Sequence, residues 1–233
     1  MGWTSENVAG DYNITREEMD QLAFLSHTRA SKAQHEGTFN DEIIPVEVSK
    51  RDPKTGEVVG KVLVTTDDVI RHGTTLPTLL KIRSAFPRWA PSQTTGGNAS
   101  QNSDGGAAVL LMRRSKAQEL GLKILGKHVG TATVGVPPRV MGIGPVYAIP
   151  AVLKQVGITK EDVDLFEINE AFASQYAYCI KELGLDVESV NVNGGAIALG
   201  HPLGATGARQ IATGMAELER RKGRVCDFPV YGV

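Results

Sequence analysis

Apolar and polar positions in the first part of the chain predict one long helix. It spans Thr15 to Glu36, and Thr15 precedes two glutamates, as a helix cap followed by an acidic first turn would. Leu22, Phe24 and Leu25 supply a modest apolar face. The segment is therefore expected to be a helix with one side packed on a core.

Two strand-like runs follow this helix, at residues 43–49 and 58–65. The sequence DPKTG between them is a turn signal, because Asp-Pro and a nearby Gly favour tight turns. We therefore expect a β-hairpin. Residues 71–101 are rich in Pro, Gly and Thr and are expected to form loops.

After Gly105 the pattern changes to short apolar runs that alternate with helical segments. The run 107–112 is continuously apolar, as in a strand that is covered on both faces. The expected strands are 107–112, 123–134, 165–168 and 190–192, and the expected helices are 115–120, 147–156, 170–183 and 205–221. Strands alternating with helices over 105–225 indicate a layered α/β domain, preceded by an irregular α+β appendage.

Charge and composition exclude several classes of function. The formal net charge is -1, and the densest basic cluster, at 220–224, ends a predicted helix, where the helix dipole already favours positive charge. We therefore expect no nucleic-acid partner. No apolar run approaches the roughly 20 residues that span a bilayer, so no membrane association is expected either. The two cysteines, Cys179 and Cys226, fit neither a CxxC pattern nor a disulfide framework, which favours a reducing compartment.

His201 is the strongest single candidate for chemistry. It lies in GHPLGATGAR, immediately before a predicted helix, with Gly200 on its N-terminal side. The positive end of the helix dipole disfavours an imidazolium, so the ring is expected to be neutral and able to accept a proton. The alternative is a histidine that only packs at a strand–helix turn.

Asn169, in the sequence NEAF, occupies the equivalent place after another predicted strand. Its alternative role is a helix N-cap, which Asn fills well. Two polar residues that each follow a strand can meet at one edge of a sheet, where open α/β sheets bind ligands. The glycine-rich runs do not fit a dinucleotide or phosphate-loop motif. The histidines at 27, 35, 72 and 128 show no metal-ligand spacing with one another or with the two cysteines.

Five motifs in one order make the chain resemble the thiolase family. They are ENVA at 6–9, GNAS at 97–100, MGIGP at 141–145, NEAF at 169–172 and GGAIALGHPLGATGAR at 194–209. The surrounding sequence is most similar to the peroxisomal type of 3-ketoacyl-CoA thiolase. The resemblance covers residues 1 to about 224.

The resemblance implies an incomplete, layered α/β fold of the thiolase (condensing-enzyme) type. Residues 1–98 would belong to a partial loop domain that is irregular and α+β, and 99–123 would end the N-terminal half of the fold. Residues 124–225 would form the C-terminal half, and 226–233 a divergent tail. Such enzymes act as homo-oligomers or with a partner subunit, and either is expected here.

The resemblance also implies the reaction and its site. Thiolases cleave 3-ketoacyl-CoA with CoA, as in fatty acid β-oxidation, and CoA is a substrate rather than a cofactor; no cofactor or metal is needed. His201 would be the base and Asn169 would help stabilise an enolate. The substrate-binding positions implied by the family are Ser100, Met141, Phe172 and Gly200.

Two family features do not match this sequence. The family's nucleophilic cysteine precedes the matched region, and its C-terminal Cys-x-Gly is replaced here by RVCDFPVYGV, in which Cys226 stands several residues too early. The alternative to an enzyme is therefore a non-catalytic fragment that binds CoA weakly or associates with a partner subunit. The resemblance implies a peroxisomal location, with the cytoplasm as the alternative, and no targeting signal is visible in the sequence.

Overall fold

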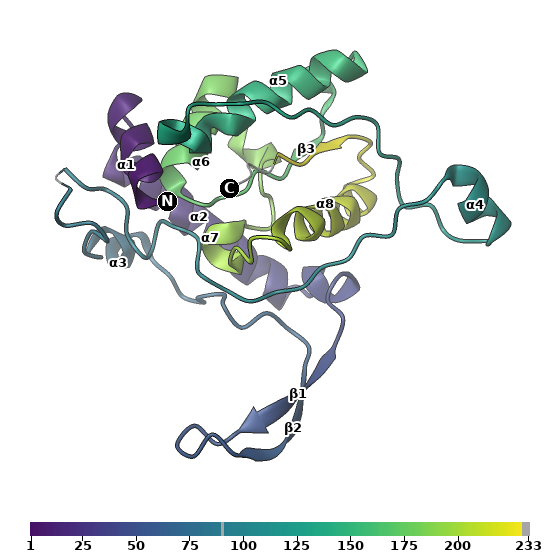
Figure 1. Ribbon diagram of the computed structural model, residues 1–233, viewed down its shortest axis with the longest axis horizontal. Coiled ribbons are helices and arrows are strands. Elements are labelled where there is room, and N and C mark those ends of the chain that lie inside the picture. Colours follow the sequence, from purple (N-terminus) through teal and green to yellow (C-terminus); the bar gives the residue numbers. More distant parts are fainter. Residues whose placement is uncertain (90, 230–233) are drawn as a thin grey trace.

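The computed structural model describes residues 1–89 and 91–229, with most helices gathered around helix α6 and strand β3 (Figure 1). The helices are α1 (Gly2–Asp11), α2 (Arg16–His35), α3 (Leu76–Leu80), α4 (Arg114–Glu119), α5 (Gly144–Val156), α6 (Ala173–Leu183), α7 (Ala196–Leu199) and α8 (Thr206–Arg221). The strands are β1 (Val46–Arg51), β2 (Val58–Val64), β3 (Leu165–Phe166) and β4 (Cys226–Asp227). Short 3-10 helices lie at η1 (Thr38–Asp41), η2 (Pro138–Ile143), η3 (Lys160–Asp162) and η4 (Val187–Ser189).

Helix α2 begins where the sequence predicts. The Thr15 hydroxyl accepts a hydrogen bond from the Glu18 backbone N–H at 3.2 Å, and the Glu18 carboxylate accepts one from the Thr15 N–H at 2.7 Å. This reciprocal pair is a capping box, and it satisfies two of the free N–H groups at the helix start. The predicted helix is confirmed.

The buried face of α2 differs from the predicted one. Leu22, Phe24 and Leu25 are only half-buried, whereas the fully buried apolar side chains are Met19, Ala23, Ala30 and Ala33. The reason is close packing against the glycine-rich segment before α7. A Cβ on Gly194 would lie 2.7 Å from that of Ala30, so only a small residue fits at position 30.

The predicted hairpin is confirmed with shifted ends. Strands β1 and β2 pair antiparallel with Val46 opposite Val64, and the Asp52 carboxylate accepts hydrogen bonds from the N–H groups of Lys54 and Thr55 in the turn. All residues of both strands are exposed, and the hairpin stands away from the helices in Figure 1.

A small parallel sheet lies in the core beside α6. Leu165 of β3 pairs with Cys226 of β4, and both β3 residues are buried. Cys226 and Asp227, in the segment 226–233 that was expected to be a divergent tail, therefore supply a sheet partner, and residues 230–233 of that segment lie outside the described residues. The strand predicted at 190–192 is reduced to a single bridge between Val190 and Phe166.

Two predicted strands are not formed. Residues 107–112 and 123–134 run as irregular chain on either side of α4, and the side chains of Leu110 and Leu111 are 78% and 76% exposed. A strand requires a hydrogen-bonded neighbour, and no segment within the described part of the chain pairs with either run. We call residues 102–137 the connecting strap; it runs out to α4 and back along the molecule in Figure 1. The predicted helix around 115–120 is confirmed as α4, and the helix predicted at 147–156 is longer, as α5 begins at Gly144.

Helices from the two ends of the chain share one core. Ala9, Ile14 and Met19 pack with Ala173 and Ile197. Helix α1 contacts η2 and α6, and α2 contacts α6 and α7. The overall arrangement is a mixed α/β fold. None of the helices within the described ranges has the length and apolar character needed to cross a membrane.

Candidate active site

His201 lies in the loop between α7 and α8, and its backbone position requires the glycine that precedes it. Gly200 has φ +85°, and a Cβ there would lie 2.4 Å from the Ser103 hydroxyl oxygen. The His201 N–H donates to the Gln101 carbonyl oxygen at 3.2 Å. The imidazole is half-buried. The loop therefore holds the ring at a fixed place against residues 101–103.

Asn169 lies three residues after the end of β3 and is fully buried. Its side-chain Nδ2 lies 3.3 Å from the His201 Nε2 atom. The Gln175 side chain donates to the Asn169 carbonyl oxygen at 3.2 Å, which fixes the loop before α6. The structure thus brings together the two polar residues that follow separate strand positions in the sequence. Asn169 is not the N-cap of α6, because that place belongs to Phe172.

The neighbours of the imidazole set its tautomer. An amide NH2 group can only donate, so Nε2 accepts from Asn169 in this arrangement. The proton is then on Nδ1, which lies 2.7 Å from the Thr206 hydroxyl oxygen and donates to it. Thr206 is the first residue of α8 and is fully buried. Sequence analysis did not identify Thr206; its place five residues after the histidine is the only signal.

The protonation state of His201 follows from its surroundings. Burial of the ring, with a smaller contribution from the positive charge of Arg209, lowers the pKa of His201 below its ordinary value of 6.5. The imidazole is therefore neutral near pH 7. A neutral ring with its Nε2 lone pair directed at a polar neighbour is suited to accepting a proton.

Replacing Thr206 by valine tests the tautomer. Valine keeps the shape but removes the acceptor for Nδ1–H, so we expect the fraction of His201 with its proton on Nδ1 to fall, as measured by nitrogen-15 NMR of the imidazole. Thr206→Ser is the matched control and should preserve the shifts. Unchanged imidazole shifts in the valine variant would show that Thr206 does not set the tautomer.

The four positions that the resemblance implies for substrate binding lie in different relations to this pair. Ser100 donates its N–H to the Ala171 carbonyl at 3.0 Å, and its neighbour Ala99 bridges Phe172. Ser100 and Phe172 therefore lie side by side, and both are half-buried. Phe172 is three residues after Asn169 in the sequence. Gly200 adjoins His201. Met141 lies in η2, which reaches α6 where Gly142 abuts Gln175.

Glu170 is a buried residue of the NEAF sequence that sequence analysis missed. It is 1% exposed, and its carboxylate accepts hydrogen bonds from the Ser26 hydroxyl at 2.6 Å, the Asn191 amide at 2.8 Å and the Ile197 N–H at 3.1 Å. One carboxylate thereby ties the Asn169 loop to α2 and to the start of α7. A Cβ on Gly195 would lie 2.3 Å from the carboxyl carbon, so this glycine makes room for the contact. In a single sequence, an acidic residue between a strand and a helix, followed later by paired glycines, is only a weak indication of a buried structural carboxylate.

An ion pair between Glu167 and Arg209 connects α8 to the segment that follows β3. The fully buried Glu167 carboxylate lies 3.1 Å from an Arg209 guanidinium nitrogen, and Gln210 donates to the Glu167 carbonyl oxygen. Helix α8 is therefore attached to β3 one turn beyond Thr206. This contact holds the His201 and Asn169 loops in register.

The ionisation of Glu167 predicts a pH dependence of stability. Burial is the main cause that raises the pKa of Glu167 to about 7, against the attraction of Arg209. The folded chain then keeps this proton between pH 4.5, where the unfolded chain releases it, and about pH 7. The stabilisation is present below this range and is lost as the pH rises through it. We expect the free energy of unfolding, relative to Glu167→Gln, to fall by on the order of 2 kcal/mol between about pH 5 and pH 8.

Urea unfolding of both proteins at the two pH values measures this difference, and the glutamine variant cancels the contributions of all other titrating groups. A constant difference between the two proteins would show that Glu167 has no raised pKa.

Neither cysteine is an activated nucleophile. Cys179 is fully buried, and burial raises the pKa of its thiol to about 12. Burial, together with the nearby Glu167 charge, also raises the pKa of Cys226 far above its ordinary value. Both thiols are therefore protonated near pH 7, and a thiolate is the reactive form. Within residues 1–89 and 91–229, no group of three or more His, Cys, Asp or Glu side chains is placed to hold a metal ion.

Two family models match the chain over nearly all its length: the thiolase N-terminal domain over residues 1–115 and the thiolase C-terminal domain over residues 122–228. Over 233 residues the chain is 55% identical to "3-ketoacyl-CoA thiolase 1, peroxisomal" of Arabidopsis thaliana and 53% identical to "3-ketoacyl-CoA thiolase, peroxisomal" of Homo sapiens. All of the chain is covered in both cases, with 52% and 53% of the relatives' lengths.

Solved structures that are similar to this chain include an acetyl-CoA acetyltransferase and a peroxisomal thiolase. The acetyl-CoA acetyltransferase of Bacillus anthracis has a TM-score of 0.91 and 43% identity, covering 99% of this chain and 57% of that one. The dimeric peroxisomal thiolase of Saccharomyces cerevisiae has a TM-score of 0.85 and 50% identity, covering 94% and 53%. The chain thus spans about half the length of the relatives it matches. With both family models matched in order, and with this identity and fold, the chain belongs to the thiolase family.

Proposed function

We propose that this chain carries the histidine–asparagine part of a thiolase-type acyltransferase site, which acts in the cleavage of 3-ketoacyl-CoA by CoA. The observation that carries the proposal is the 3.3 Å contact between the side chains of Asn169 and His201. It supports a site because each residue comes from a separate loop and each is held there by independent contacts.

In this proposal, His201 first acts as a base. Its Nε2 lone pair accepts the proton of a cysteine thiol, and the resulting thiolate attacks the keto carbon of the substrate. The bond between the keto carbon and the α-carbon then breaks, which leaves an acyl group on sulfur and the enolate of acetyl-CoA. An acid of the complete site gives a proton to the α-carbon, which yields acetyl-CoA, and its conjugate base then takes the proton of the CoA thiol. The CoA thiolate accepts the acyl group, and the cysteine leaves as a thiolate and regains its proton from His201. Because Cys179 is buried, Cys226 is half-buried and the pKa of each thiol is raised, the nucleophilic thiol would come from another segment or chain.

The protonated Nε2 then acts as a donor to the enolate oxygen. Asn169 is placed beside it, and its Oδ1 is buried with no hydrogen-bond partner among the described residues, so it can accept from a water or substrate group. Donors directed at developing charge in such a site are worth about 3 kcal/mol each. His201 and Asn169 are therefore proposed to act together on the thioester oxygen.

The binding of CoA is supported by a cavity next to this site. A cavity of about 640 Å3 is lined by α2 and by residues 71–77, including Arg71 and His27. Arg71 donates to the Gln101 side chain at 3.2 Å, and the Gln101 carbonyl accepts from the His201 N–H. A chain of contacts thus runs from the cavity at Arg71 to the backbone of His201, which supports a ligand with phosphates at one end and a thioester at the other.

We propose a peroxisomal location, because the relatives are named peroxisomal, and association with a second copy or a thiolase partner, because the yeast relative is described as dimeric. The exposed leucines of the connecting strap support such an association, since an apolar face of this kind is usually covered.

A second candidate function is a non-catalytic CoA-binding protein. The observation that favours it is that neither thiol of the chain is activated. It predicts weak binding of CoA without turnover.

A chimera separates the two candidates. Residues 1–224 replace the matching segment of the Arabidopsis relative, so that the remaining residues of that relative supply the rest of the enzyme. We expect thiolysis of a 3-ketoacyl-CoA, followed as loss of its absorbance, to stay within about tenfold of the relative, because only a half of the site has been exchanged at 55% identity. The unaltered relative is the control. A folded chimera that binds CoA without turnover would refute the first function and favour the second.

A further inference from the structure

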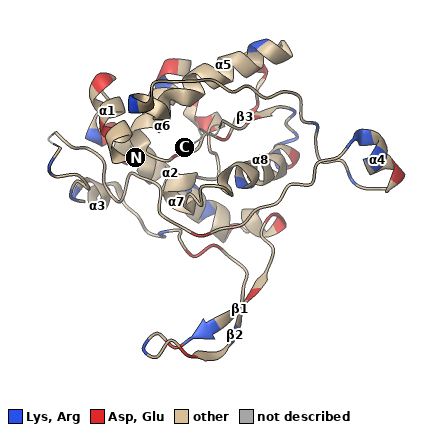
Figure 2. Ribbon diagram, in the orientation of Figure 1, with Lys and Arg blue, Asp and Glu red and all other residues tan. Residues whose placement is uncertain are grey.

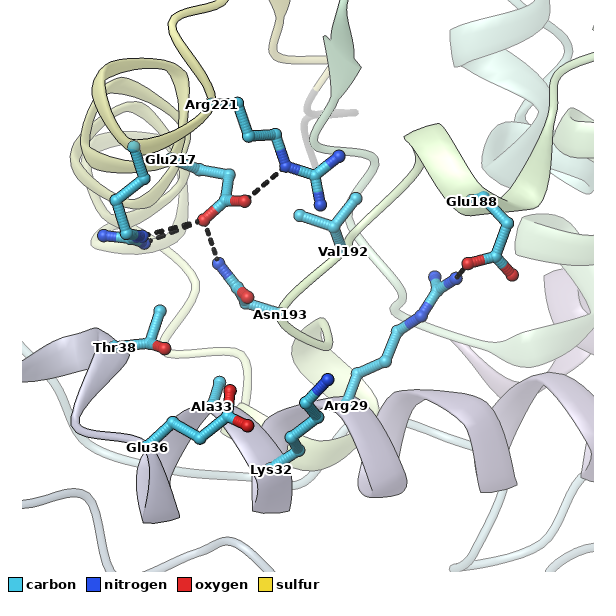
Figure 3. Close-up of a pocket in the computed structure, with 11 residues that line it drawn as sticks. Arg29, Lys32, Ala33, Glu36, Thr38, Glu188, Val192, Asn193, Glu217 and Arg221 are labelled. Atoms are coloured by element: carbon cyan, nitrogen blue, oxygen red, sulfur yellow. Dashed lines mark hydrogen bonds and ion pairs between the residues drawn. The ribbon is translucent and has the colours of Figure 1, made fainter.

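A second polar cavity lies between α2, the loop at 188–193 and the C-terminal end of α8 (Figure 3). Its volume is about 510 Å3. Helix α8 has 16 residues, so at 1.5 Å per residue this end lies about 22 Å from Thr206 beside His201. This end of the cavity is therefore distant from His201, although Lys32 and Glu36 also line the cavity at Arg71.

The cavity has an excess of positive charge. Four basic side chains line it, Arg29, Lys32, Arg220 and Arg221, against three acidic ones, Glu36, Glu188 and Glu217. Elsewhere on the molecule basic and acidic residues are interspersed, as along α4 in Figure 2. One positive charge thus remains uncompensated in a space that is partly enclosed.

Two of the acidic groups are already occupied by basic ones. Glu217, with a side chain only 8% exposed, pairs with both Arg220 and Arg221 and accepts a hydrogen bond from Asn193 at 2.9 Å. Glu188 pairs with Arg29 at 3.1 Å, and Arg29 also donates to the carbonyls of Val187 and Val190. These contacts hold the guanidinium groups in place before any ligand arrives.

Two donors that line the cavity, on Arg221 and Lys32, are not fully used by these pairs. Arg221 uses only Nε on Glu217, and the two Nη groups have no acceptor within the described residues. The Lys32 ammonium likewise has no ion-pair or hydrogen-bond partner there, and Figure 3 shows it directed from α2 into the space between Arg29 and Asn193. A fixed guanidinium opposite a lysine is the arrangement that binds a phosphate dianion.

We propose that this cavity is a phosphate-binding site, in which Arg221 and Lys32 hold the oxygens of a dianionic phosphate group, either free or carried by a phosphomonoester. Arg29 and Arg220, which are paired with Glu188 and Glu217, add positive charge around the site. Glu36, the residue that follows α2 and lies four positions after Lys32, limits the site to strongly anionic groups, because a monoanion gains less against its repulsion.

Equilibrium dialysis with radiolabelled inorganic phosphate tests this site on the chain as it exists, and the amount bound per chain does not depend on self-association. We expect saturable binding of one phosphate, with a dissociation constant raised about fivefold or more in both Lys32→Gln and Arg221→Gln. Lys154→Gln, which removes an exposed charge on α5 outside the cavity, is the matched control and should bind as the unaltered chain does. Absence of saturable binding, or equal weakening in all three variants, would overturn the proposal.

Competition identifies the source of the phosphate. If CoA displaces the label and dephospho-CoA does not, the site takes the 3′-phosphate of CoA; if glycerol phosphate alone displaces it, the site takes a small phosphomonoester. Displacement by chloride at the same ionic strength would instead show a diffuse ion atmosphere and would refute a built site. Because Arg221 does not line the cavity at Arg71, loss of phosphate binding in its variant is independent of the proposed acyltransferase function.

Discussion

Replacing His201 by glutamine in the chimera is expected to lower kcat/KM for thiolysis by about 10^4-fold, since the change removes both a general base and a donor to the developing enolate. Glutamine can still form a hydrogen bond to Asn169, but it cannot accept the thiol proton. The measurement is kcat/KM as a function of pH. Activity of the unaltered chimera should fall as the pH drops through the lowered pKa of the imidazole, whereas the residual activity of the variant should lack that step.

Asn169→Ala provides the companion measurement. It leaves the base in place and removes only the group beside it, so a smaller loss of about 10^2-fold is expected, with the pH step retained. If kcat/KM of the His201→Gln variant stays within tenfold of that of the unaltered chimera, or if its activity still falls at acidic pH, His201 is not the base.

Replacing Glu170 by alanine is expected to lower the free energy of unfolding by about 3 kcal/mol, because it leaves three buried donors without an acceptor. Those donors are on Ser26, Asn191 and Ile197, so the loss affects α2, the loop at 191 and α7 together. Urea unfolding followed by circular dichroism measures the change.

Glu182→Ala is the matched control, since Glu182 is an exposed glutamate on α6, and its effect should stay within about 0.5 kcal/mol. Glu170→Gln keeps the shape and one acceptor oxygen, so its loss should be intermediate. An alanine variant as stable as the Glu182 control would mean that the Glu170 contacts do not stabilise the fold.

Features set by neighbouring residues were predictable from the sequence. The capping box at Thr15 and Glu18 and the Asp52 turn each involve residues within a few positions of one another, so a single sequence contains all of their determinants. The meeting of Asn169 and His201 was anticipated because both follow apolar segments in an alternating pattern. The roles of these residues stay a proposal.

Features that depend on distant partners were not predictable. The apolar run around Leu110 has the composition of a buried strand, but a strand also needs a neighbour at hydrogen-bonding distance, and composition does not supply one. In the same way, Glu170 reads as an ordinary acid at a helix start. Only the folded chain brings Ser26, 144 positions away in the sequence, to its carboxylate.

The connecting strap has a consequence for the integrity of the chain. Its backbone between 102 and 113 and between 121 and 137 lies outside helices and strands, so a protease can fit these peptide bonds into its cleft without unfolding the rest. A nick on either side of α4 would leave α1 and α2 held against α6 and α7 by the shared core. The two pieces would then migrate as one particle in native solution and separate only in denaturant, so that the polypeptide can be cut there while His201 and Asn169, both in the second piece, stay paired.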